Sequence, residues 1–143
     1  MRLATRRFGE IDVEEDDLLT FPEGLVGLSR HKRFLLLQDP ESKQLLWLQS
    51  VDFPEFTLAT VPSQQVQLNY HIDVHPEEIR CLKLDNKSEA VVLLILNRVN
   101  EQFAVNLKGP LLLNPHRMLG KQVVLNDPDY EVRNLVAIDA TVT

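Results

Sequence analysis

The sequence contains a single cysteine, Cys81, among its 143 residues. One cysteine excludes a disulfide within the chain and a zinc site built from several thiolates. Hydrophobic runs are short, and the longest, residues 90–96, falls far below the roughly 20 residues that cross a bilayer as a helix. Residues 1–7 carry charges with no apolar stretch behind them, unlike a secretory signal. We therefore expect a cytoplasmic protein that does not associate with membranes.

Positive charge and catalytic motifs are also scarce. The chain has 15 lysines and arginines against 21 aspartates and glutamates, a net charge of −6. This balance disfavours direct binding to nucleic acid, whose phosphates are neutralised by basic side chains, but it suits a basic protein partner. No glycine belongs to a Gly-x-Gly-x-x-Gly or Gly-Lys-Ser/Thr phosphate loop. Because no nucleophile, base and acid form a recognisable catalytic motif, we predict no enzymatic activity and no cofactor.

Short apolar runs separated by turn residues dominate what is present. They favour an all-β, mainly antiparallel fold. Continuous apolar runs such as residues 34–37 are typical of strands covered on both faces or closed into a small, complete or partial β-barrel. A break at residues 109–110 and a turn at residues 120–121 would complete a meander, and residues 130–133 would form a last strand or edge. We predict a single domain over residues 1–143 with one or two short helices, one of them over residues 76–82.

An alternating segment, residues 70–75, offers a possible metal site. In a strand, His71, Asp73 and His75 would share one face about 6–7 Å apart at each step. Imidazole and carboxylate groups are metal ligands by type, although this spacing suits two ligands and a third from a neighbouring strand better than three in a row. The simpler interpretation is three solvated positions opposite a buried apolar face. The alternative function is a small metal- or ligand-binding β-barrel.

Acidic side chains cluster near the N-terminus. Six of the eight positions from residue 10 to residue 17 are acidic: Glu10, Asp12, Glu14, Glu15, Asp16 and Asp17. Such a run is usually a solvated turn. The alternative is a docking surface for a basic protein, because clustered charge steers a complementary partner.

Two further pairs are candidates for contact with a partner. Phe53 and Phe56 flank Pro54 in a turn, where aromatic side chains either anchor a partner or cap the core. Asn106 and Lys108 are polar positions that strand alternation places on one face, opposite apolar neighbours. A partly buried amide there either satisfies backbone groups of a turn or contacts a partner.

Several short motifs, taken together, resemble the flagellar assembly factor FliW family. The likeness extends from about residue 5 to residue 133, and its specificity lies in the order and spacing of the pieces. Val26 stands where that family usually has proline, and Gly109 where it usually has alanine. The motifs are Phe8-Gly9-Glu10-Ile11, Phe21-Pro22-Glu23-Gly24-Leu25, Leu48-Gln49-Ser50, Asn106-Leu107-Lys108 with Pro110, Gly120-Lys121-Gln122, and Tyr130-x-x-Arg133.

The resemblance implies a binding protein and not an enzyme. Members of this family bind the RNA-binding regulator CsrA and relieve its repression of flagellin translation, and they also bind flagellin, which displaces them from CsrA. The fold it implies is a small antiparallel β-barrel with few helices. We therefore expect CsrA and flagellin as partners. The candidate partner-binding residues are Glu14, Glu15, Asp16, Asp17, Phe53, Phe56, Asn106 and Lys108.

Overall fold

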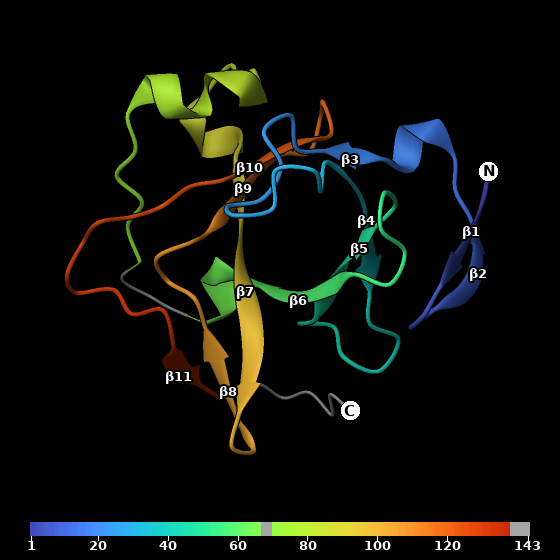
Figure 1. Cartoon of the computed structure of the whole chain (residues 1–143). Helices are drawn as coiled ribbons and strands as arrows, with labels where there is room; N and C mark the ends of the chain where they lie inside the picture. Colours follow the sequence, from blue (N-terminus) through green and yellow to red (C-terminus); the bar gives the residue numbers. More distant parts are fainter. Residues whose placement is uncertain (67–69, 138–143) are drawn as a thin grey trace.

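Seven strands close into a barrel in the computed structural model, which describes residues 1–66 and 70–137 (Figure 1). Around the ring the order is β7, β6, β5, β4, β3, β10 and β9, and β9 pairs back onto β7. All these pairings are antiparallel except that of β3 with β10. The predicted closed, mainly antiparallel barrel is confirmed. Its strands are β3 (Leu19–Thr20), β4 (Arg33–Gln38), β5 (Leu46–Ser50), β6 (Thr57–Pro62), β7 (Val91–Val99), β9 (Leu111–Asn114) and β10 (Leu119–Gln122).

The longest strand, β7, carries the sheet beyond the barrel. Its first residues pair with β9, and its last residues pair with β8 (Gln102–Val105). Strand β11 (Asn134–Val136) adds to β8 on the other side. The expected strand over residues 130–133 is therefore wrong. The Tyr130 hydroxyl donates to the carbonyl oxygen of His71 (2.9 Å) and accepts from the amide of His71 (2.7 Å), and the Glu131 carbonyl oxygen accepts from the amide of Leu107 just after β8 (2.9 Å), so this segment approaches the sheet edge but regular pairing begins only at Asn134.

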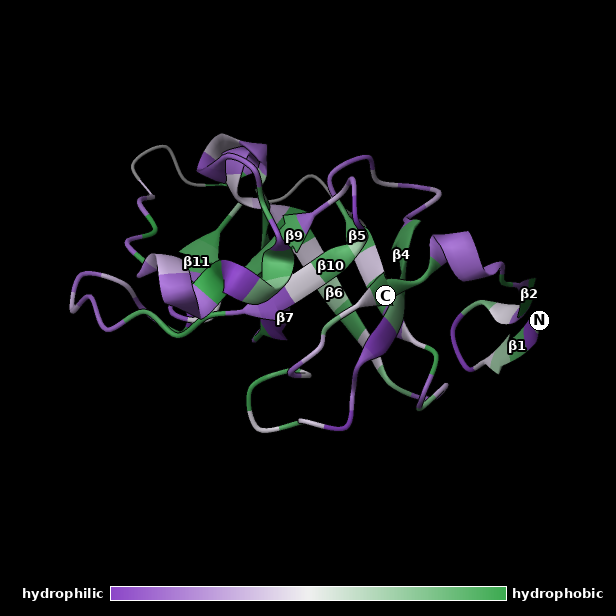
Figure 2. Ribbon diagram, turned by 90° about the horizontal axis from the view of Figure 1, so that it is seen from above, coloured by the Kyte–Doolittle hydropathy of each residue, from purple (hydrophilic) through white to green (hydrophobic). Residues whose placement is uncertain are grey.

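The continuous apolar runs are strands buried on both faces, as predicted. On β4, Phe34 points into the barrel with Phe21 and Leu48, whereas Leu35 packs on the outside against Leu3 of the N-terminal hairpin. Viewed from above, β9 and much of β4 are hydrophobic, and the short helix beside the N-terminus is hydrophilic (Figure 2). The burial of both strand faces is what removes polar alternation from these sequences.

The predicted turn at residues 120–121 is wrong, because both residues lie in β10 and the turn occupies residues 115–118. Gly120 serves packing instead. A Cβ atom at this position would lie 2.6 Å from the ring of Phe21, which is fully buried. Glycine therefore allows an aromatic ring to lie flat against the strand.

A two-stranded hairpin, β1 (Arg2–Thr5) and β2 (Gly9–Asp12), precedes the barrel. The four residues of β1 include Arg2 and Thr5 and carry little apolar signal of a strand. Gly9 adopts a left-handed conformation (φ 66°) where the three-residue loop ends. Within the described residues neither strand pairs with the barrel.

All helical segments of the described residues are short 3-10 helices, four in number against the one or two expected. They are η1 (Glu15–Asp17), η2 (Ser63–Gln65), η3 (Pro76–Leu82) and η4 (Lys87–Glu89). The segment η3 has the predicted bounds: Pro76 opens it, and the Nδ1 atom of His75 accepts from the amide of Glu77 (3.3 Å). No helix among these residues is long and apolar enough to span a membrane.

Candidate partner-binding surface

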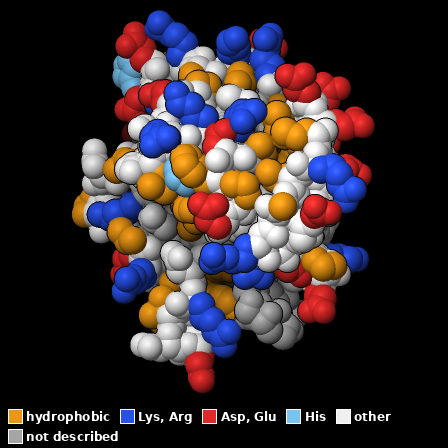
Figure 3. All heavy atoms as spheres, turned by 45° about the vertical axis from the view of Figure 1, so that its right-hand side comes forward, with side chains coloured by type: hydrophobic (Ala, Val, Ile, Leu, Met, Phe, Trp, Pro, Cys, Tyr) orange, Lys and Arg blue, Asp and Glu red, His pale blue; other side chains and the backbone are white. Residues whose placement is uncertain are grey.

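An acidic strip runs along β2 and η1. It comprises Glu10, Asp12, Glu14, Glu15, Asp16 and Asp17, all exposed. Buried Val13 and Leu19 fix the two ends of the η1 segment to the rest of the molecule. The amide of Glu14 donates to the Asp17 carboxylate (3.2 Å), which shapes the turn. Acidic side chains gather along one margin of the face in Figure 3. The predicted solvated run is thus a fixed, exposed patch of negative charge.

One arginine partly offsets this charge. Arg2 on β1 lies 3.3 Å from Glu10 and 3.6 Å from Asp12, but all three side chains are largely exposed. Exposed pairs of this kind contribute little to stability and compete poorly with water. No ion pair involves the four acids of residues 14–17 within the described part of the chain. The negative charge that no ion pair offsets therefore lies mainly at residues 14–17.

An open hollow of about 470 Å³ lies beside the strip. Its lining combines apolar side chains with two carboxylates at the rim, which suits the aliphatic stem and charged head of a lysine or arginine. Arg33 of β4 also lines the hollow, and its charge is paired with Asp52 (2.9 Å). The lining residues are Met1, Val13, Glu14, Glu15, Leu18 and Arg33.

Asp52, in the turn after β5, connects this turn to Lys32 and Arg33, where β4 begins. Its carboxylate accepts from the backbone amides of Lys32 (3.1 Å) and Arg33 (2.9 Å) and from the Arg33 guanidinium (2.9 Å). Partial burial alone would raise the pKa of Asp52, but the hydrogen bonds from Arg33 and from the two amides outweigh it and lower the pKa below its usual value. Asp52 is therefore ionised at neutral pH and fixes the position of the neighbouring aromatic residues.

An aromatic cluster forms where this segment meets the turn. The ring of His31 lies 4.3 Å from that of Phe53 and 4.4 Å from that of Phe56, and the Arg30 guanidinium lies over Phe53 at 5.7 Å. The Nδ1 atom of His31 is buried without a hydrogen-bond partner among the described residues. Sequence analysis missed His31, because no spacing rule connects it to a turn some 20 residues away.

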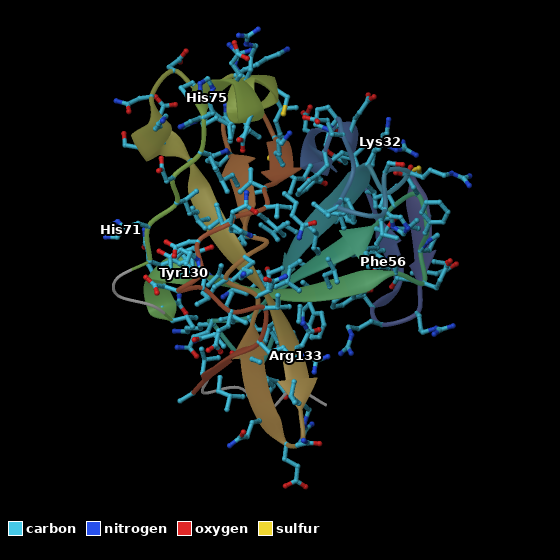
Figure 4. All side chains as sticks on the ribbon, turned by 60° about the vertical axis from the view of Figure 1, so that its left-hand side comes forward. Lys32, Phe56, His71, His75, Tyr130 and Arg133 are labelled. Atoms are coloured by element: carbon cyan, nitrogen blue, oxygen red, sulfur yellow. The ribbon has the colours of Figure 1, made fainter. Side chains whose placement is uncertain are left out.

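Phe53 and Phe56 differ in what holds them. Phe56, labelled in Figure 4, packs against the barrel core as well as against His31. Phe53 is held through its backbone amide, which donates to the Ser50 hydroxyl (2.9 Å), and its partly exposed ring stacks on His31. Phe56 therefore caps the core as the simpler interpretation expected, and Phe53 is the better candidate anchor.

The loop over residues 22–29, which leads into His31 of the aromatic cluster, exposes two apolar side chains. Val26 and Leu28 are 55% and 40% exposed, and the carbonyl oxygen of Leu28 accepts from the amide of His31 (3.1 Å). The loop is held in place, since the amide of Val26 donates to the Gln122 side chain (2.9 Å). Gly24 is required here, because a Cβ atom would lie 2.5 Å from the carbonyl oxygen of Ser29.

Asn106 and Lys108 lie in the bend after β8 and not in a strand, although the predicted alternation of burial holds. The side-chain oxygen of Asn106 accepts from the amides of Lys108 (2.9 Å) and Gly109 (3.0 Å). Asn106 thus satisfies backbone groups of a turn. No hydrogen bond or ion pair in the described part of the chain connects either residue to the acidic strip.

The residues proposed for a metal site do not come together. Residues 71–75 form no strand, although His71, Asp73 and His75 are exposed and Val74 is buried, as the solvated interpretation predicts. In Figure 4, His71 and His75 lie well apart, with Tyr130 beside His71. Among the described residues no group of three or more histidine, cysteine or acidic side chains could hold a metal ion.

Cys81 is a poor nucleophile in this environment. Burial raises the pKa of its thiol, and the hydrogen bond to Glu23 raises it further. A protonated thiol reacts weakly. Glu23 is itself committed to an ion pair with Lys121 (2.8 Å).

Comparison with known proteins agrees with this architecture. The sequence model of the FliW protein family matches residues 2–136. The chain is 38% identical to the flagellar assembly factor FliW of Geobacter sulfurreducens, over 94% of this chain and 85% of that protein, and 38% identical to that of Natranaerobius thermophilus, over 94% and 91%. A crystal structure of the flagellar assembly factor FliW superimposes with a TM-score of 0.87 at 27% identity, covering 94% of this chain and 96% of that one. The chain therefore belongs to the FliW family of flagellar assembly factors.

Proposed function

We propose that this protein binds the translational regulator CsrA through the acidic strip, relieves its repression of flagellin translation, and also binds flagellin. It acts in the cytoplasm without catalysing a reaction and without contacting nucleic acid directly. In this way the level of free flagellin controls how much flagellin is made. Family membership supports the role in flagellar assembly, and the acidic strip supports the first partner.

The exposure of the acidic strip is the observation that carries the proposal. A regulator that binds RNA must present a basic surface to the phosphates. Six exposed carboxylates, four of them with no ion pair in the described part of the chain, would attract that surface and repel RNA from it. The hollow beside Glu14 and Glu15 adds apolar contact for the stem of a basic side chain.

The aromatic cluster offers a second contact surface. Phe53 presents a partly exposed ring stacked on His31, and the His31 amide is bonded to the carbonyl oxygen of Leu28, whose side chain is exposed. Rigid aromatic side chains beside apolar neighbours are typical of binding hot spots. We propose that Phe53 anchors at least one of the two partners.

Support for a reaction is lacking. The titratable side chains of the acidic strip are exposed, and Cys81 is protonated. The relatives described above are named as assembly factors, and their names mention no reaction. A binding role is the more economical account of this chain.

Binding titrations with purified CsrA and flagellin from the same cell test the proposal. The wild-type protein should bind each partner, lower the affinity of CsrA for flagellin mRNA, and lose CsrA when flagellin is added. Neutralising the four acids of residues 14–17 should weaken binding to CsrA more than to flagellin. Failure of the wild-type protein to bind either partner would rule the proposal out.

A further inference from the structure

We propose that the outer edge of β2 binds an extended segment of a partner protein by strand addition, and that this segment alternates basic with apolar side chains. The hairpin is a separate two-stranded sheet, and within residues 1–66 and 70–137 neither strand has a second neighbour. An open strand edge presents unpaired backbone groups that can pair with another chain.

The register of the hairpin identifies which backbone groups face outward. Met1 and Val13 exchange two backbone hydrogen bonds, at 3.0 and 2.6 Å. Antiparallel strands alternate bonded and non-bonded pairs, so the pairs Arg2–Asp12 and Ala4–Glu10 are non-bonded. The amide and carbonyl groups of Glu10 and Asp12 therefore point away from β1. No hydrogen bond to these groups occurs in the described part of the chain.

The two faces of β2 specify the side chains of the incoming segment. Glu10 and Asp12 are exposed on one face, and neighbouring residues of an added strand would lie about 5 Å from them. Lysine or arginine at those positions would pair with the two carboxylates. On the opposite face, partly exposed Ile11 borders the apolar cluster that contains Leu3 and Val13. An apolar side chain at the intervening positions would extend that cluster.

Charge also excludes a second copy of this chain as the occupant. Two β2 edges placed side by side would bring Glu10 and Asp12 of one copy against those of the other, and like charges on adjacent strands destabilise pairing. A basic segment meets no such repulsion, and as it passes the end of β2 it reaches the acids of η1 and the hollow lined by Glu14 and Glu15.

A short peptide tests this edge directly. The probe is a six-residue peptide of alternating lysine and valine with both ends blocked, and its control replaces lysine with glutamate. Hydrogen exchange and ¹⁵N–¹H spectra of the full chain are recorded with each peptide. The lysine peptide should slow exchange of the Glu10 and Asp12 amides, and the glutamate peptide should leave them unchanged.

Two substitutions at Asp12 separate backbone pairing from charge. Asp12→Asn removes only the charge and should weaken binding of the lysine peptide about 2- to 5-fold. Asp12→Pro also removes the outward amide, which plays no part in pairing with β1, and should weaken binding about 10-fold or more. Ile11 is already extended, so it tolerates a following proline.

Trp47 reports whether the hairpin of each variant remains in place, because Arg7 and Phe8 of the hairpin loop contact its ring. Equal affinity of Asp12→Pro and Asp12→Asn for the lysine peptide would overturn the proposal. So would peptide-induced protection in wild type that maps away from Glu10 and Asp12, a readout that stands even if Asp12→Pro fails to fold. The test contains no CsrA, so its failure leaves the proposed binding of CsrA unaffected.

Discussion

The barrel and the N-terminal hairpin are built in opposite ways. Each barrel strand is hydrogen-bonded to a neighbour on both sides, and the interior is filled by side chains such as Phe21 and Phe34, which have no exposed surface. Among the residues that the structure describes, the two hairpin strands pair only with each other, and side chains hold the hairpin to the barrel: Leu3 and Val13 at its base, and Arg7 over Trp47 at its loop. We therefore expect the buried core of the barrel to supply most of the stability. The hairpin and η1 present the six exposed carboxylates of the acidic strip.

This division has a consequence for how mutations should act. Substitutions inside the barrel should lower the free energy of unfolding with little direct effect on binding, because these side chains are buried. Substitutions of the six acids on β2 and residues 14–17 should change association while leaving the fold intact, since these side chains are exposed. Measurements of unfolding and of binding on the same variants separate effects on stability from effects on association.

The largest effect is expected for Phe21→Ala. Phe21 packs edge-on to Phe34 at 5.3 Å and covers Gly120, so its removal leaves a cavity at the centre of the barrel. We expect a loss of about 3–5 kcal/mol in the free energy of unfolding, measured by urea denaturation. Val124→Ala, at a largely exposed position, is the control and should change stability by less than about 0.5 kcal/mol. A loss for Phe21→Ala no larger than that of the control would show that the barrel interior is not the main source of stability.

The next effect concerns binding by the aromatic cluster. Phe53→Ala should weaken the complex with CsrA or with flagellin by about 1–2 kcal/mol, as expected for a hot-spot residue. Because the Phe53 ring contacts His31 and Arg30 more than the core, the variant should remain folded. Isothermal titration with each partner, after a check of the melting temperature, decides the matter. Unchanged affinity for both partners would show that Phe53 is not part of the binding surface and would leave the acidic strip as the candidate.

Asp52 lies between the two regions, and its effect should depend on pH. The folded protein lowers the pKa of Asp52, so its contribution to stability is present above the usual aspartate pKa of about 4 and is lost as pH falls through the lower folded value. At pH 7, Asp52→Asn should reduce the free energy of unfolding by about 1 kcal/mol. Denaturation curves at a series of pH values should show this deficit shrinking below pH 4. A deficit that stays constant across the series would contradict the assigned role.

The smallest effect is expected at the loop of the hairpin. Arg7→Ala removes the guanidinium that lies 3.9 Å from the centre of the Trp47 ring. Cation–π contacts at exposed sites contribute about 0.5–1 kcal/mol, so stability should fall by no more than that. Trp47 is the sole tryptophan, and its emission should shift as the ring gains access to water. An unchanged emission maximum would show that the hairpin loop stays on the barrel without this contact.

Much of the fold could be predicted because the strands of a closed barrel have a distinctive sequence. Runs such as residues 34–38 and 90–96 lack polar alternation, and turn residues separate them. The hairpin strand β1 escaped detection, since Arg2 and Thr5 leave too little apolar signal over four residues. Gly120 was misread as a turn because the sequence does not reveal the ring of Phe21 above it.

The candidate surface could be predicted only where its residues are close in sequence. The acidic strip is a local run, so composition alone revealed it. The aromatic cluster requires contact between the rings of His31 and Phe53, which lie in two separate segments of the chain. Asp52 holds these two segments together through three hydrogen bonds. The segment over residues 71–75 does not form the strand that its alternation suggests, and the Tyr130 hydroxyl bonds both backbone groups of His71 at its start, a tertiary contact that alternation cannot show.

We propose that the four acids at residues 14–17, in η1 and at its N-cap, supply the field that attracts CsrA. The most direct measurement is the stopped-flow association rate with CsrA across a salt series. The test variant combines Glu14→Gln, Glu15→Gln, Asp16→Asn and Asp17→Asn. The control variant removes the same number of charges from exposed positions elsewhere on the chain, by Glu41→Gln, Glu78→Gln, Glu101→Gln and Glu131→Gln.

Neutralising η1 should slow association at low salt more than the control does, and the difference should shrink as salt rises, because exposed charges are screened within about 8 Å at physiological ionic strength. Both variants should keep the melting temperature of the wild type, since all eight positions are exposed. Identical rates and salt slopes for the wild type and the η1 variant would contradict the account and reduce this run to a solvated turn.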